Sequence, residues 1–175
     1  MPARLPPTVS ALQIGGDGPL APEPLGIDES LVIRAAPTRV FAAFFDPAAL
    51  AQWWQVARSV TMPRPLGIYA VEWHPSAVKD EVFGPLGGVF HGRIIDIVPG
   101  SEVFVADAWW IPPESDPVGP MGLHVTCTAE GGGCRVRVRQ QGGDPDPRWE
   151  RYYRIIGAGW RSALEALRHY MEHGA

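Results

Sequence analysis

The sequence lacks the features that mark membrane, exported and nucleic-acid-binding proteins. No apolar run approaches the roughly 20 residues that cross a bilayer, and the N-terminus has no cationic start followed by an apolar stretch and a cleavage site. We therefore predict a cytoplasmic protein with no membrane partner. The net charge of -4 also argues against a general attraction to phosphate backbones, so we expect no nucleic-acid partner.

Metal-ligating and cofactor-binding patterns are scarce as well. The two cysteines, Cys127 and Cys134, have no histidine or cysteine at zinc-ligand spacing, and we expect free thiols that face each other across a hairpin turning near Glu130 and Gly131. His169 and His173 stand four residues apart on a helix, but no third ligand accompanies them. The glycine clusters lack the lysine and hydroxyl residue of a phosphate-binding loop. We predict no metal and no cofactor.

Proline and glycine divide the chain into two regions. Residues 1–26 are so rich in both that we expect a tail, or a strap lying on the domain. Residues 27–175 are long enough for one core and are predicted to form a single domain.

Hydrophobic periodicity predicts the elements of that domain. A strand over 27–35 is followed by a helix from Pro37 to about Phe45, and by a second short helix that Asp46 caps. Short alternating runs between residues 56 and 141 indicate about six antiparallel strands. A long helix then begins at the Asp146-Pro147 pair and continues to Met171. The pattern indicates an α+β fold.

Three separated segments resemble a known family. The segment 31–54 (LVIRAAPTRVFAAFFDPAALAQWW) resembles the opening of START-like domains of the birch-pollen-allergen superfamily. The segments 87–110 (GGVFHGRIIDIVPGSEVFVADAWW) and 159–172 (GWRSALEALRHYME) resemble the branch named after an activator of a heat-shock chaperone ATPase. The resemblance implies a helix-grip fold, in which a curved antiparallel sheet surrounds a long C-terminal helix and leaves a cavity between them. It does not imply one activity.

Aromatic residues suggest what such a cavity holds. The chain has seven tryptophans, more than a small core usually needs, and together they favour a roomy aromatic pocket. Alternation along two strands and the apolar face of the last helix give the predicted ligand-binding set: Tyr69, Val71, Trp73, Val105, Asp107, Trp109, Tyr153, Ile156 and Trp160.

Asp107 is the one acidic residue of this set. Parity places it with Val105 and Trp109, although the opposite face of that strand is also apolar and would leave the carboxylate in solvent. A three-residue turn at 99–101 would set Arg93 opposite Asp107, whereas a two-residue turn would set Gly92 there. We predict that Asp107 points into the cavity as its polar anchor.

The leading interpretation is a protein that binds a small, largely apolar molecule. A cyclase- or hydrolase-like enzyme using the same cavity is the alternative, but no Ser-His-Asp or Cys-His arrangement is evident and we name no catalytic residue. A chaperone-associated interaction module ranks third, because the domain has no clear partner-binding extension unless the tail of residues 1–26 serves as one. The protein is expected to be a monomer or a homodimer.

Overall fold

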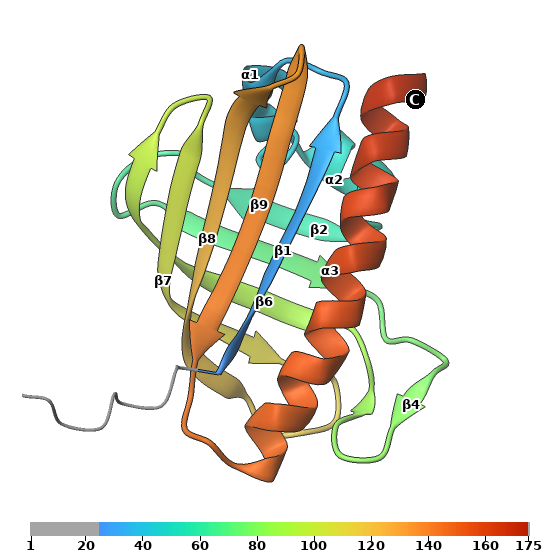
Figure 1. Cartoon of the computed structure of the whole chain (residues 1–175). Coiled ribbons are helices and arrows are strands. Elements are labelled where there is room, and N and C mark those ends of the chain that lie inside the picture. Colours follow the sequence, from blue (N-terminus) through green and yellow to red (C-terminus); the bar gives the residue numbers. More distant parts are fainter. Residues whose placement is uncertain (1–24, 175) are drawn as a thin grey trace, which may run out of the picture.

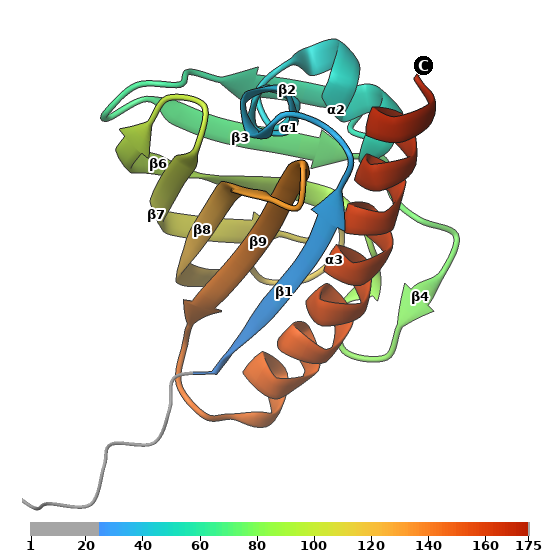
Figure 2. The same ribbon diagram turned by 45° about the horizontal axis from the view of Figure 1, so that its top comes forward.

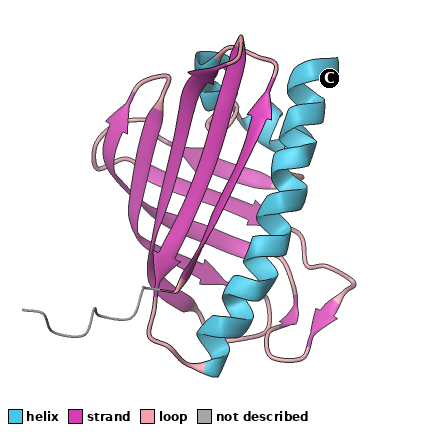
Figure 3. Ribbon diagram, in the orientation of Figure 1, coloured by secondary structure: helices cyan, strands magenta, loops and turns pink. Residues whose placement is uncertain are grey.

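The computed structural model describes residues 25–174, and most of the proline-rich segment therefore lies outside the described residues. The order of elements is a strand, two short helices, a set of strands and a long helix (Figures 1 and 3). Their bounds are β1 Gly26–Ile33, α1 Pro37–Ala42, α2 Pro47–Trp53, β2 Arg58–Thr61, β3 Ile68–Trp73, β4 Lys79–Asp80, β5 Gly84–Pro85, β6 Gly88–Val98, β7 Glu102–Ile111, β8 Val118–Glu130, β9 Gly133–Gly142 and α3 Pro147–His173.

Seven strands form one antiparallel sheet in the order β1-β9-β8-β7-β6-β3-β2. The sheet curves strongly, α3 runs alongside β1, and α1 and α2 sit together at one end (Figures 1 and 2). β4 and β5 form a separate small hairpin that projects beside α3. The helix-grip architecture predicted from the sequence is confirmed.

The predicted caps begin two of the helices. The Asp46 carboxylate accepts hydrogen bonds from the backbone N–H groups of Ala48 and Ala49 at 2.7 and 3.1 Å. Asp146 accepts one from Trp149 N–H at 2.9 Å. A proline follows each cap, where its missing N–H costs nothing. Within residues 25–174, no helix has the length and apolar character needed to cross a membrane.

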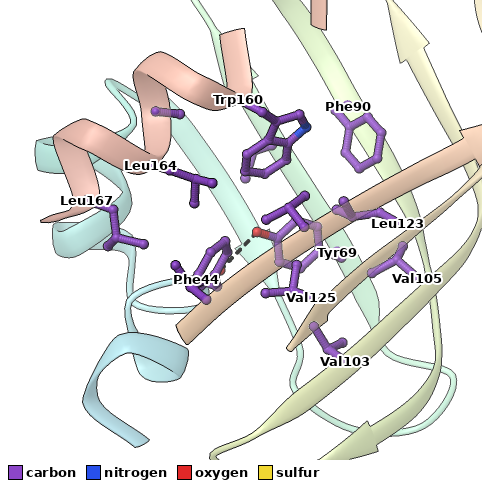
Figure 4. Close-up of a cluster of buried hydrophobic side chains, with 14 of the residues drawn as sticks. Phe44, Tyr69, Phe90, Val103, Val105, Leu123, Val125, Trp160, Leu164 and Leu167 are labelled. Atoms are coloured by element: carbon purple, nitrogen blue, oxygen red, sulfur yellow. Dashed lines mark hydrogen bonds between the residues drawn. The ribbon is translucent and has the colours of Figure 1, made fainter. Parts of the chain in front are cut away.

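The core fills the space between the concave face of the sheet and α3. Figure 4 shows Trp160, Leu164 and Leu167 of α3 pointing toward strand side chains, and all three are almost fully buried. Gly157 lets the helix approach β1, since a Cβ at this position would lie 3.3 Å from Cγ2 of Ile27.

The hairpin between β8 and β9 differs from its predicted register. Gly131 and Gly132 both have positive φ and form a two-residue turn, so Ala129 pairs with Cys134 and Cys127 with Val136. The predicted direct pairing of the two cysteines is therefore wrong by two residues. Because side chains alternate with a period of two, this shift leaves both buried thiols on the same face of the sheet.

Candidate functional site

A pocket of about 320 Å³ lies between α3 and the sheet. Strands β3, β6, β7 and β9, the N-terminal half of α3, and the segments flanking the β4–β5 hairpin supply its walls. Fifteen residues line it, namely Trp54, Gln55, Trp73, His74, Ser76, Leu86, Gly87, Phe90, Trp110, Gln140, Tyr152, Ile155, Ile156, Gly159 and Trp160.

Tryptophans build one wall of the pocket. The ring of Trp54 lies 5.0 Å from that of Trp73 and 4.7 Å from that of Trp160, measured between ring centroids. On the other side Trp54 stacks on Trp53 at 5.0 Å with an interplanar angle of 7°. The indole N–H of Trp73 donates to the Trp54 carbonyl at 2.9 Å, which fixes the two rings relative to each other. Trp73 meets Trp54 edge-on at 76° and Trp160 is tilted from it by 38°, so the wall presents both edges and faces of aromatic rings.

A polar cluster lies at the buried end of the pocket. Gln140 on β9 is 1% exposed, and its amide oxygen accepts a hydrogen bond from the indole N–H of Trp160 at 3.0 Å. Its amide nitrogen donates to the hydroxyl oxygen of Tyr152 at 2.6 Å. Burial raises the pKa of Tyr152 far above its ordinary value, so this phenol stays protonated. The cluster is neutral and offers hydrogen bonds rather than charge.

The other end of the pocket meets solvent at three exposed residues, Gln55, His74 and Gly159. Gln55 follows the end of α2 with a φ of 55°, a conformation that favours glycine. A Cβ added at Gly159 would meet no atom within 4 Å. The missing side chain at this helical position therefore leaves the pocket wider.

The β4–β5 hairpin flanks this end of the pocket, because Ser76 and Leu86 at its base are lining residues. Asp80 anchors it to α3: one carboxylate oxygen accepts from the backbone N–H groups of Val82 and Phe83, and the other from Arg151 Nε and Nη2 at 2.9 and 2.6 Å. Burial pushes the pKa of Asp80 upward, but the Arg151 guanidinium and the two N–H groups outweigh it and hold the pKa below its usual range.

Three of the predicted ligand-binding residues, Trp73, Ile156 and Trp160, line the pocket. The structure does not bring the others to it. Tyr69, Val71 and Val105 are buried within the packed core, and the hydroxyl of Tyr69 donates to the Phe44 carbonyl (Figure 4). Tyr153 is also buried, and its hydroxyl donates to the Gly142 carbonyl at 3.0 Å.

Asp107 does not point into the cavity, and the prediction that it does is wrong. β7 carries a bulge, in which Asp107 and Ala108 together face Gly92, and Asp107 has a φ of 48°. The bulge reverses the alternation beyond Val105. Asp107 is therefore exposed and accepts a hydrogen bond from the half-buried Trp109 indole at 3.1 Å, outside the pocket, while Trp110 turns inward.

The partner considered for Asp107 is also placed differently. The turn does hold three residues, since Val98 pairs with Glu102. A second bulge in β6, between Ile94 and Asp96, shifts the register by one, so Arg93 pairs with Ala106. The Arg93 guanidinium donates to the Leu66 carbonyl instead.

Sequence reasoning missed the pocket's polar floor. Gln140 has the parity of Val136 and Val138, which alternate with Arg135, Arg137 and Arg139 along the sequence, so a signal for an inward glutamine was present. Tyr152 is adjacent to the predicted Tyr153, and only the rotation of α3 about its axis decides which of the two faces the pocket. Placing Trp110 in the pocket would have required knowledge of the bulge in β7.

No metal centre is evident among residues 25–174, where no three histidine, cysteine, aspartate or glutamate side chains gather in a suitable group. His169 and His173 stack on each other with ring centroids 4.6 Å apart on the exposed face of α3.

Solved structures of similar fold come from several bacteria. Protein CV1439 from Chromobacterium violaceum shares 25% sequence identity at a TM-score of 0.61, over 84% of this chain and 96% of that one. The Aha1 dimer from Colwellia psychrerythraea shares 13% identity at a TM-score of 0.61, over 86% and 98%. CalU16 from Micromonospora echinospora shares 16% identity at a TM-score of 0.58, over 85% and 76%.

No curated protein matches the sequence. A family model does match it, over residues 34–172, which is most of the chain and includes α1 and all but the last residue of α3. This match agrees with the resemblance carried by the three sequence segments. The chain belongs to the family of Activator of Hsp90 ATPase homolog 1-like proteins.

Proposed function

We propose that this protein binds a small, largely apolar molecule in the pocket between the sheet and α3. The observation that carries the proposal is the composition of the walls. Six of the fifteen lining residues are aromatic, three more are leucine or isoleucine, and the polar groups are confined to the two ends. Ligand pockets in proteins combine such apolar walls with a few placed polar groups.

The size of the pocket limits the ligand. An apolar protein cavity of about 150 Å³ admits benzene. The pocket here is about 320 Å³, roughly twice as large, and suits a molecule of two or three rings. The six aromatic side chains of the lining favour rings over a flexible chain.

The titratable groups in the lining support binding rather than a reaction. Within the described residues, the lining contains one histidine, His74 at the exposed end, and one tyrosine, Tyr152 at the buried end. Tyr152 stays protonated because burial raises its pKa, so it acts as a hydrogen-bond donor and not as a base at neutral pH.

The test uses the fluorescent probe N-phenyl-1-naphthylamine, which is apolar and of suitable size. We expect its emission to rise on binding to the folded protein, and the Trp54 and Trp160 emission to be quenched. Gly159→Leu places a side chain where a Cβ would meet open space, and should weaken probe binding at least about tenfold. Ala158→Leu adds the same side chain at the preceding exposed position and should leave binding unchanged.

Both variants should unfold at temperatures within a few degrees of the wild type, since neither position is buried. If the folded wild-type protein does not bind the probe, or if the two leucine variants bind it equally well, the pocket is not the binding site.

A further inference from the structure

At the buried end of the pocket, the chemistry of Trp160 and Gln140 fixes which group donates and which accepts in each hydrogen bond. An indole N–H only donates, so the Gln140 oxygen must face Trp160, which turns the amide nitrogen toward Tyr152. The amide nitrogen also only donates, so the Tyr152 oxygen acts as its acceptor. The chemistry of Trp160 thus fixes the orientation of the amide, and the hydrogen of the Tyr152 hydroxyl has to find a different acceptor.

The acceptor within reach of that hydrogen is a poor one. The Tyr152 hydroxyl lies 3.3 Å from the sulfur of Met121, and the Gln140 amide nitrogen lies 2.8 Å from the same atom. A thioether sulfur is a weak acceptor, and here two donors compete for it. A buried hydroxyl in this position gains from any stronger acceptor that a ligand brings.

We propose that the pocket selects apolar ring molecules that carry an oxygen acceptor, such as two-ring aromatic ketones, with the ketone oxygen accepting a hydrogen bond from the Tyr152 hydroxyl. This inference rests on the proposed ligand-binding function. The rings lie against the tryptophan wall of Trp54 and Trp160, and the acceptor faces the polar cluster of Gln140 and Tyr152. Hydrocarbons of the same shape leave the hydroxyl with the sulfur alone and bind more weakly than their size predicts.

Two molecules of matched shape test this selection. 1-Tetralone and tetralin share the same two rings, and only the former carries a carbonyl group. Their dissociation constants are measured by displacement of N-phenyl-1-naphthylamine from the wild type, Tyr152→Phe and Tyr153→Phe. The quantity of interest is the ratio of the tetralin constant to the tetralone constant, because it cancels changes in the pocket that affect both ligands.

We expect this ratio to fall about three- to tenfold in Tyr152→Phe, the usual worth of one hydrogen bond, with little change in the tetralin constant itself. Tyr153→Phe is the matched control. It removes the hydroxyl of the neighbouring buried tyrosine, which donates to the Gly142 carbonyl and not to the pocket, and should leave the ratio unchanged.

The outcomes separate the two proposals. If no probe or ligand binds the folded wild type, the proposed function fails and this inference with it. If both ligands bind but Tyr152→Phe keeps the wild-type ratio, or if both phenylalanine variants lower it equally, the function stands and the Tyr152 contact is wrong. A second readout needs no variant: the carbonyl stretch of bound 1-tetralone should lie at lower wavenumber than in hexane, and an unshifted band would overturn the hydrogen bond.

Discussion

Replacing Asp80 by alanine should open the β4–β5 hairpin without unfolding the domain. The Asp80 side chain is 5% exposed, and its carboxylate holds both the turn of the hairpin, through Val82 and Phe83, and α3, through Arg151. The hairpin contributes Phe83 to the core, and the seven-stranded sheet makes no hydrogen bond to Asp80. The loss should therefore be felt locally, in the segment from Ser76 to Gly87.

The structure sets the size of the effect. Removing one partner of a fully buried ion pair costs about 3–5 kcal/mol, because the other charge is left without compensation. Arg151 is 33% exposed, so water can solvate the guanidinium once Asp80 is gone, and the cost falls to about 2 kcal/mol. An opening equilibrium shifted by that amount makes the open hairpin roughly 30 times more populated.

Amide hydrogen exchange measures this shift directly. We expect exchange in the segment from Ser76 to Gly87 to accelerate by roughly 30-fold in Asp80→Ala, and exchange in β8 and β9 to stay unchanged. Glu81→Ala is the matched control, since it removes an exposed carboxylate from the same hairpin. Exchange in Asp80→Ala that stays within twofold of the control would show that the ion pair does not hold the hairpin.

The pH dependence follows from the lowered pKa of Asp80. A carboxylate whose pKa is depressed in the folded state contributes its full stabilisation above the unfolded value of about 3.9, and loses it as the pH falls through the folded value. The ratio of exchange rates between Asp80→Asn and the wild type should therefore be constant from pH 5 to 7 and fall toward one below about pH 4. A ratio that already falls near pH 6 would point to a different titrating group.

Two further predictions concern stability, measured by urea denaturation. Gln55→Gly should raise the free energy of unfolding by about 0.5–1 kcal/mol, because φ at this position is 55°, whereas Gln52→Gly inside α2 should lower it by about 1 kcal/mol. A loss at both positions would contradict the argument. Trp160→Ala should lower the free energy of unfolding by about 3–5 kcal/mol, since the ring is 3% exposed and its indole N–H donates to Gln140. A loss below about 2 kcal/mol would mean that neighbouring side chains collapse into the space left by the ring.

The elements of the fold were predictable because their signals are local. The dipeptides Asp46-Pro47 and Asp146-Pro147 specify where α2 and α3 begin, and each signal is only two residues long. The structure has both caps. The alternation of Val136 and Val138 likewise specifies the inner face of β9 without knowledge of its neighbours. Each of these features is decided by residues close together in the chain.

The candidate site was less predictable because it depends on register. The bulge at Asp107 inserts one residue into β7, and with it every later side chain of the strand changes face. Neither the position nor the existence of a bulge is visible in an alternation of apolar residues on both faces, such as Phe104 and Val105. Asp107 and Trp109 were placed inward for that reason, and Trp110 was missed.

The two halves of α3 have different surroundings. In its C-terminal half, Leu164, Leu167 and Met171 are buried in packed core. In its N-terminal half, Ile155, Ile156 and Gly159 keep part of their surface exposed and border the pocket. A change of side-chain volume in a packed core destabilises the fold, whereas a pocket wall can accommodate a larger side chain.

This division has a consequence for the proposed ligand binding. Substitutions at the half-buried positions of the N-terminal half alter the shape of the pocket at little cost to folding, while the hydrogen bonds of Gln140 and Tyr152 hold the polar floor in place. Under the proposed function, such substitutions would change which ring systems fit the pocket while the hydrogen bonds of Gln140 and Tyr152 stay the same.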